Sequence, residues 1–188
     1  EREAETWELL ALTRARVVWA SSPQFAEAAA GAVESALRRP GDRARTAADV
    51  RDMRALLERE RPPKGEWDLK LSPGGLVDIE FAAQYLQLAH AADGGPLRQN
   101  TAEALAAFDG LAPADALAAL RKAWALQQNL TQLLKVALGD NADPTDEPKA
   151  FRMLLARAGE VRDFRALRTK LESSRKGARS AYETIVGA

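Results

Sequence analysis

Apolar residues recur at helical spacing along most of this chain, and the alternation of apolar and polar residues that marks strands is absent. Between residues 76 and 92, for example, Leu76, Ile79, Ala83 and Leu86 fall on one stripe. Alanine, the strongest helix former, is abundant throughout. The pattern predicts an all-α bundle of about seven to eight helices, over roughly residues 4–20, 22–39, 46–60, 76–92, 100–110, 113–138, 147–158 and 162–185.

Proline and glycine fall between these periodic segments and mark the turns. The clearest internal break is Asp93-Gly94-Gly95-Pro96. A chain of 188 residues can form one sizeable core, or two small cores that share an interface. We therefore expect a single helical domain over residues 1–188, and we place the boundary between two candidate subdomains near residues 93–99.

One segment carries residues that packing alone does not require. Lys70 stands just before the turn Pro73-Gly74-Gly75, and a helix with an acid in its first turn follows at once. Pro73 and Gly74 suit the central positions of a type II turn, because proline presets φ and glycine supplies a positive φ. Free backbone N–H groups at the helix start, with Lys70 beside them, would suit an anion such as a phosphate. A Walker A loop is excluded because no Gly-Lys-Ser/Thr follows.

Asp78 and Glu80 are the acids of this helix, but helix geometry argues against a simple carboxylate pair, because residues two apart point about 200° away from each other. From the pattern alone, Asp78 is interpreted as a structural acid in the first turn that accepts backbone N–H bonds. Glu80 faces either solvent or a neighbouring domain. Arg14 lies on the apolar stripe of the first predicted helix, so we expect a buried ion pair with Glu80 or Asp78, with a nucleotide or domain contact as the alternative. Arg16 faces a different side.

Charge and composition exclude several classes of partner. Lys+Arg and Asp+Glu both number 27, so no net field attracts nucleic acid or an anionic membrane. No uncharged apolar run approaches the roughly 18 residues that span a bilayer, and no signal-peptide pattern is present. The absence of cysteine excludes disulfides and thiolate metal sites, and it fits a cytoplasmic location.

The last predicted helix carries a basic run that acids interrupt. We expect it to be a solvated helix face, with a docking surface for an acidic partner as the alternative. The residues of this run are Arg162, Arg165, Arg168, Lys170, Arg175, Lys176 and Arg179.

Two ordered stretches of the sequence carry a family resemblance. Lys70, Gly74-Gly75 and Asp78-Ile79-Glu80-Phe81 are similar to the signature Lys-x(3)-Gly-Gly-x-x-(Asp/Glu)-Ile-Glu-Phe of the glutamine synthetase adenylyltransferases. Trp7-Glu8 and Ala11-Leu12-Thr13-Arg14-Ala15-Arg16-Val17-Val18 resemble the family's helix that follows its nucleotidyltransferase domain. The resemblance covers roughly residues 5–110, and helical pattern and length extend it further.

The resemblance implies a helical domain that follows a nucleotidyltransferase domain not contained in these residues, and Asp78 points to the C-terminal, adenylylating half of the family's enzymes. Such an enzyme transfers AMP from ATP to a tyrosine of glutamine synthetase with Mg²⁺, under control of glutamine and the PII signalling protein. The site residues that the resemblance implies lie at the domain interface or near the nucleotide: Lys70, Gly74, Gly75, Asp78, Glu80, Arg14 and Arg16.

No catalytic or metal-binding residue is expected in this chain, because the family's Gly-Ser turn with closely spaced aspartates is not in the sequence. ATP and Mg²⁺ are therefore expected to bind the rest of such an enzyme, and the isolated chain is expected to be inactive. Two alternatives remain open. One is an independent helical module that docks glutamine synthetase or PII without touching the nucleotide. The other is the related helical domain of the PII uridylyltransferases, although the continuous Asp78-Ile79-Glu80-Phe81 favours the adenylyltransferases.

Overall fold

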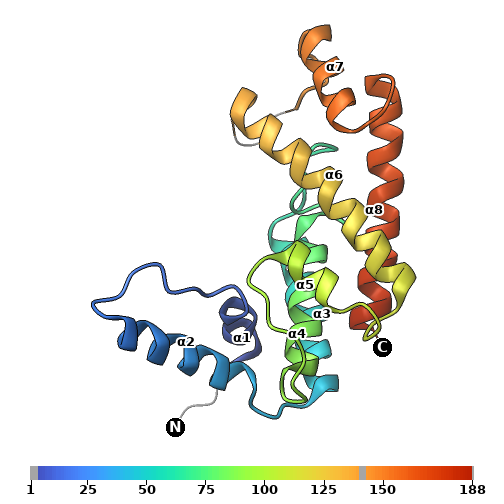
Figure 1. Ribbon diagram of the computed structural model, residues 1–188. Helices are drawn as coiled ribbons and strands as arrows, with labels where there is room; N and C mark the ends of the chain where they lie inside the picture. The colour runs from blue at the N-terminus through green and yellow to red at the C-terminus, as the bar shows by residue number, and fades with distance from the viewer. Residues whose placement is uncertain (1–3, 140–142, 188) are drawn as a thin grey trace.

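The computed structural model describes residues 4–139 and 143–187, and all regular structure in these residues is helical (Figure 1). This confirms the predicted all-α bundle. The eight helices of the described residues are α1 (Thr6–Leu12), α2 (Pro23–Leu37), α3 (Arg43–Glu60), α4 (Leu76–Ala91), α5 (Thr101–Ala107), α6 (Ala114–Leu138), α7 (Lys149–Ala158) and α8 (Phe164–Val186). No helix in this part of the chain has the length and apolar character needed to cross a membrane.

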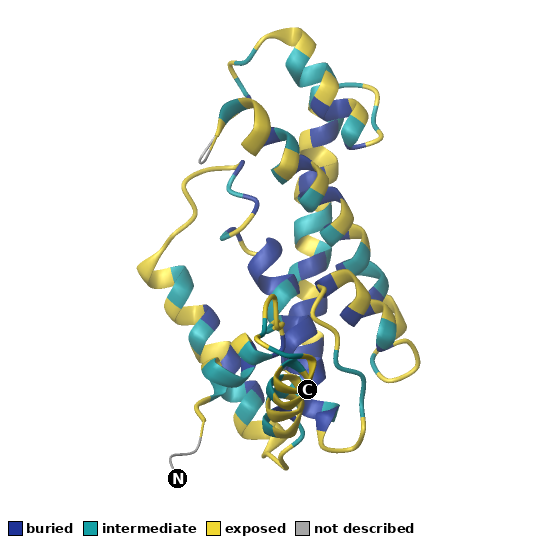
Figure 2. Ribbon diagram, turned by 60° about the vertical axis from the view of Figure 1, so that its left-hand side comes forward, coloured by how far each residue is buried: buried dark blue, intermediate teal, exposed yellow. Residues whose placement is uncertain are grey.

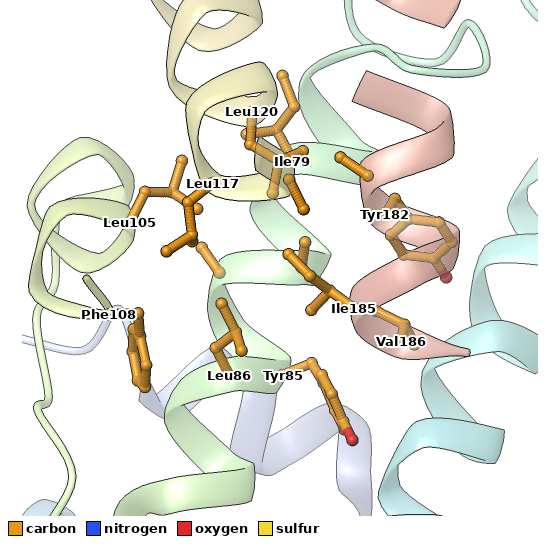
Figure 3. Packing of buried hydrophobic residues seen from close by; sticks show 14 of the residues in the cluster. Ile79, Tyr85, Leu86, Leu105, Phe108, Leu117, Leu120, Tyr182, Ile185 and Val186 are labelled. Carbon is orange, nitrogen blue, oxygen red and sulfur yellow. The ribbon is translucent and has the colours of Figure 1, made fainter. Parts of the chain in front are cut away.

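Helix α4 is the central element, and it is buried along almost its whole length (Figure 2). It packs against α1, α3, α5, α6 and α8, while α6 and α8 lie along each other. The larger core gathers around α4, with side chains of α5, α6 and α8 packed against it (Figure 3). Its fully buried members include Ile79, Leu105, Phe108, Leu117 and Leu120. The position of α4 means that residues just before it are held by the whole bundle.

A second, smaller core lies where α6, α7 and α8 meet the loop before α4. Trp67 stacks on Phe164, with 5.2 Å between the ring centroids, and Leu69 joins buried leucines of α6, α7 and α8. Both cores therefore share α6 and α8. The proposed boundary near residues 93–99 stays a prediction, although α4 and α5 on either side of it contribute to the same core.

The first helix is shorter than predicted, because α1 ends at Leu12 and residues 15–20 are neither helix nor strand. The Thr13 hydroxyl donates to the Leu10 carbonyl oxygen (2.7 Å), and only short turns follow through Ala15. Most helical stability in proteins comes from packing an apolar face, and no neighbouring element covers Val18 or Trp19. The expectation of a helix to residue 20, with Arg14 on its buried stripe, was therefore wrong.

Helix α3 begins three residues earlier than predicted, at Arg43. Its N-cap is Asp42, whose carboxylate accepts hydrogen bonds from the backbone N–H groups of Ala44 and Arg45. Asp is among the preferred N-cap residues because its side chain satisfies these otherwise unpaired donors. Thr46, near which the sequence pattern placed the start of this helix, lies inside the helix instead.

Candidate functional site

The glycine turn before α4 has the predicted conformation. The Gly75 N–H donates to the Ser72 carbonyl oxygen (2.7 Å), and Gly74 has a φ of 72°, as the third position of a type II turn requires. A Cβ atom at Gly74 would lie 1.9 Å from the carbonyl oxygen of Arg175 in α8. Gly74 is therefore required both by its backbone conformation and by the close approach of α8.

Gly75 is required for a different reason, because its φ of −76° is accessible to any residue. A Cβ atom there would lie within 3.0 Å of the carbonyl oxygens of Ser72, Leu69 and Lys70. The loop folds so tightly under the start of α4 that only a hydrogen fits. The double glycine is thus a packing requirement of the turn as well as a conformational one.

Asp78, in the first turn of α4, is fully buried and lies at the centre of a charged network. One carboxylate oxygen accepts a hydrogen bond from Arg54 Nε of α3. The other accepts from the Gly74 N–H (2.7 Å) and from Arg179 Nη1 of α8 (3.2 Å). A buried carboxylate needs such partners, since an unpaired charge in the interior is costly. Asp78 therefore joins the turn, α3 and α8.

Arg54 extends this network under the loop. Its side chain is only 2% exposed, and its Nη2 atom donates to the Leu71 carbonyl oxygen (3.0 Å) and lies 3.3 Å from Glu58 Oε1. Glu58 in turn accepts a hydrogen bond from Arg179 (2.7 Å). Two carboxylates and two guanidinium groups from three helices thus meet beneath the turn. One signal in the sequence points to Arg54, because it follows Val50 by one helical turn on the buried face of α3.

Helices α6 and α8 hold the same loop from the other side. Gln127 of α6 is buried, and its side-chain amide donates to the Gly74 carbonyl oxygen (2.9 Å). Arg175 of α8 donates to the carbonyl oxygens of Glu66 (2.7 Å) and Asp68 (3.1 Å), while Arg168 forms an ion pair with the Glu66 carboxylate (2.7 Å). The expectation that the basic run of α8 is only a solvated face was therefore wrong. Part of it fixes residues 66–78.

Burial and charge shift the pKa of two groups beside this network. Burial alone would lower the pKa of Arg179, but its hydrogen bond to Glu183 and the charge and hydrogen bond of Asp78 outweigh burial and raise it. Burial, followed by the negative charge of Asp78, raises the pKa of Tyr182 to about 12. The Tyr182 hydroxyl has no hydrogen-bond partner among the described residues. Arg179 therefore remains charged, and Tyr182 remains neutral, throughout the physiological pH range.

The start of α4 is not the open anion site that the sequence indicated. The N–H groups of Leu76 and Val77 donate to the carbonyl oxygens of Leu69 (2.9 Å) and Lys70 (3.2 Å), because the preceding loop folds back over the helix start. The Asp68 carboxylate fixes this loop by accepting from the N–H groups of Lys70 and Leu71. The acid that the turn receives is Asp78 of the same chain, so the expectation of free N–H groups there was wrong.

The remaining candidate residues lie at the surface. Glu80 forms an ion pair with Arg14 (3.0 Å), which confirms one of the two partners expected for Arg14. The pair is not buried as predicted, since the Arg14 side chain is 49% exposed and that of Glu80 is 21% exposed. Lys70 and Arg16 are also exposed. The helix thus points Asp78 into the protein and Glu80 outwards, as their spacing predicts.

A groove of about 640 Å³ runs beside the turn along α8. Ser72 and Pro73 form one wall, and charged residues of α8, among them Arg175 and Arg179, form the other. The groove therefore shares Arg179 with the buried network. In the described part of the chain, no group of three or more His, Asp or Glu side chains is arranged to hold a metal ion.

Comparison with known proteins gives two consistent findings. The family model described as GlnD PII-uridylyltransferase matches residues 45–185. The curated protein of Caulobacter vibrioides that is similar to this chain is a bifunctional glutamine synthetase adenylyltransferase/adenylyl-removing enzyme, 66% identical over an alignment of 188 positions that covers 99% of this chain. Proteins with the same description in Rhodopseudomonas palustris (strain TIE-1) and Rhizobium meliloti are 39% and 40% identical, over 100% and 99% of this chain.

The chain spans 19% of the length of each of these relatives. Their descriptions favour the adenylyltransferases over the PII uridylyltransferases as the proteins that carry this version of the domain. The matched region of the family model contains the turn, the buried network and helices α4 to α7 with almost all of α8. The chain therefore belongs to the helical-domain family that this model describes, in the form found in the glutamine synthetase adenylyltransferases.

Proposed function

We propose that these residues form the helical domain that supports a nucleotidyltransferase domain in a glutamine synthetase adenylyltransferase. The intact protein would transfer AMP from ATP to a tyrosine of glutamine synthetase with Mg²⁺, in the cytoplasm. The relatives' descriptions support this activity. ATP and Mg²⁺ belong to the rest of the polypeptide, because the aspartate signature of a nucleotidyltransferase is not in this sequence.

The observation that carries the proposal is the way in which the bundle fixes one surface segment. Residues 66–78 are held on the inner side by contacts of Arg54, Gln127 and Arg175, and Asp78 at the end of this range is itself buried. Lys70 remains exposed on the outer side. A short loop held by so many contacts suits a surface that must meet another domain in a fixed orientation. Misplacing a catalytic group by about 1 Å lowers the rate about 100-fold. Lys70, Glu80, Arg14 and Arg16 are the residues of this surface, and Gly74, Gly75 and Asp78 position them.

Two finer assignments follow from the resemblance. Asp78 in the signature supports the C-terminal, adenylylating half of the enzyme as the origin of this domain. Glutamine synthetase would be the macromolecular substrate, and the PII protein would be the regulatory partner. In this arrangement the helical domain orients the nucleotidyltransferase domain, and the chemistry itself takes place outside residues 1–188.

The proposal is tested by Lys70→Ala and Glu80→Ala, each made in the intact protein and in the 188-residue chain. We expect slower transfer of AMP to glutamine synthetase by the intact variants. The melting temperature of the chain should stay nearly unchanged, because Lys70 is exposed and Glu80 forms only a surface ion pair with Arg14, which contributes about 0–1 kcal/mol. Lys122→Ala and Glu103→Ala, which replace exposed residues of α6 and α5, are the matched controls and should change neither quantity.

Two results would contradict the interface role. If the chain itself loses stability, Lys70 and Glu80 are structural. If AMP transfer to a small surrogate substrate survives both changes while transfer to glutamine synthetase falls, the surface docks the protein substrate. The domain would then act as an interaction module.

A further inference from the structure

Residues 15–20 form an exposed apolar segment between α1 and α2. Val18 is 80% exposed and Trp19 is 81% exposed, and Val17 beside them is also exposed. Phe25 at the start of α2 is 62% exposed. Figure 2 shows this region largely in the colours of exposed and intermediate residues, in contrast to α4. Single exposed apolar residues are common in soluble proteins, but a contiguous group of this kind marks an interaction site.

The backbone of residues 15–20 belongs to no helix, strand or turn and is available for pairing. Among the described residues, the N–H and C=O groups of residues 16–19 have no hydrogen-bond partner. Val17, Val18 and Trp19 are residue types that favour strands, in which Val17 and Trp19 would face one side and Val18 the other. An exposed apolar edge with unpaired backbone groups is a template for adding a strand to a sheet. The segment thus has the composition of a strand, and its unpaired backbone groups can join a sheet.

Both ends of the segment are anchored to the helical domain. At one end, Arg14 pairs with Glu80 of α4 (3.0 Å) and the Thr13 hydroxyl bonds to Leu10. At the other end, Ser22 caps α2 by accepting a hydrogen bond from the Phe25 N–H (3.2 Å). A sheet that paired with residues 15–20 would therefore lie at a fixed place beside Glu80.

The family model and the longer relatives match different parts of this chain. The helical-domain family model begins at residue 45, so it leaves out α1, residues 15–20 and α2. The adenylyltransferase relatives match 99–100% of the chain, including this part. Four-fifths of their length lies outside the matched region, since the chain spans 19% of it. The longer adenylyltransferases therefore share the exposed segment, and the helical bundle alone does not require it.

We propose that residues 15–20 pair as a β-strand with the edge of a sheet in the nucleotidyltransferase part of the same polypeptide. The inference rests on the proposed function and adds the mode of contact, which is strand addition. Main-chain hydrogen bonds supply affinity in this mode, and pockets for alternate side chains supply specificity. Trp19 and Val17 fill one face of that contact. The Arg14–Glu80 pair lies at its edge and sets the orientation of the two domains.

Hydrogen exchange measured on the intact protein and on the 188-residue chain tests this pairing. In the chain, the amides of residues 16–19 should exchange at the rate of an unstructured peptide. In the intact protein, at least alternate amides of this segment should be slowed by about 100-fold or more, as for a stably paired strand. Equal, fast exchange in both proteins would overturn the pairing, even if the intact protein transfers AMP. An intact protein without AMP transfer would instead contradict the proposed function.

A pair of substitutions tests the side-chain contact. Trp19→Ser in the intact protein should reduce the protection of residues 16–19 by at least about tenfold, without lowering the melting temperature of the isolated chain. Val136→Ser is the matched control, because Val136 of α6 is 87% exposed and lies outside the segment. It should leave the protection unchanged. Protection that arises in the isolated chain as its concentration rises, together with a doubled mass in sedimentation, would overturn the proposal in favour of a second copy as the partner.

Discussion

Replacing Asp78 by Asn in the 188-residue chain removes one buried negative charge and leaves the shape of the side chain almost unchanged. The guanidinium group of Arg54, whose side chain is 2% exposed, then keeps Glu58 as its only carboxylate partner among the described residues, at 3.3 Å. Arg179 keeps Glu58 and Glu183. The Asn amide can still accept a hydrogen bond from the Gly74 N–H, so the main consequence is an undercompensated positive charge in the interior.

The size of the effect follows from this arrangement. Removing one partner of a buried ion pair costs about 3–5 kcal/mol. Glu58 remains near both guanidinium groups, so we expect the lower end, about 3 kcal/mol. For a chain of this length, each kcal/mol lowers the melting temperature by about 2–4 °C, which gives a decrease of roughly 6–12 °C.

Thermal unfolding followed by far-UV circular dichroism measures this decrease. Asp109→Asn is the control, because Asp109 also pairs with an arginine, Arg121, but its side chain is 65% exposed. Its melting temperature should stay close to that of the parent chain. A second variant, Asp78→Leu with Arg54→Met, removes both charges and should recover much of the lost stability. An unchanged melting temperature for Asp78→Asn, or a double variant no more stable than the single one, would show that Asp78 does not compensate a buried charge.

Two further predictions concern residues around the same network. Gly74→Ala should destabilise the chain much more than Gly110→Ala. Both glycines have positive φ, but only at Gly74 would the added Cβ atom clash with a backbone atom. Equal melting temperatures of the two variants would contradict the clash with α8. Tyr182 has a pKa of about 12 against its ordinary value of 10.0, so the stability it contributes is present below pH 10 and is lost as the pH rises towards 12. The melting temperature of the parent should therefore fall more steeply with pH over this range than that of Tyr182→Phe. If the two melting temperatures fall in parallel, burial does not protect the hydroxyl.

The sequence predicted the elements whose signals are local. Helix α5 begins within the predicted range, with Asn100 as its N-cap, and the long periodic segment from Pro113 to Leu138 is a single helix. Periodicity failed at residues 13–20, where apolar residues at helical spacing have no neighbouring element to pack against. Helical spacing indicates that a face can be buried, but whether it is buried depends on the rest of the fold.

The candidate site was predictable to the same extent. The type II turn follows from residue types and spacing, and the structure confirms it. For Arg14 the sequence left Glu80 and Asp78 open as partners; the structure selects Glu80, and the pair is not buried as predicted. The residues that hold the turn were missed because their contacts are distant in sequence. Asp78 meets Arg54 from 24 residues away and Arg179 from 101 residues away, while Gln127 reaches Gly74 across 53 residues. Such contacts depend on how the helices pack, which a one-dimensional pattern does not specify.

On the proposed function, this domain supports a nucleotidyltransferase domain and performs no transfer itself. Incorporation of labelled AMP from ATP into glutamine synthetase tests it directly, with the intact protein and the pure 188-residue chain measured side by side at equal concentration with Mg²⁺. We expect incorporation by the intact protein and only background with the chain. Incorporation above background by the pure chain, or none by the intact protein, would contradict it.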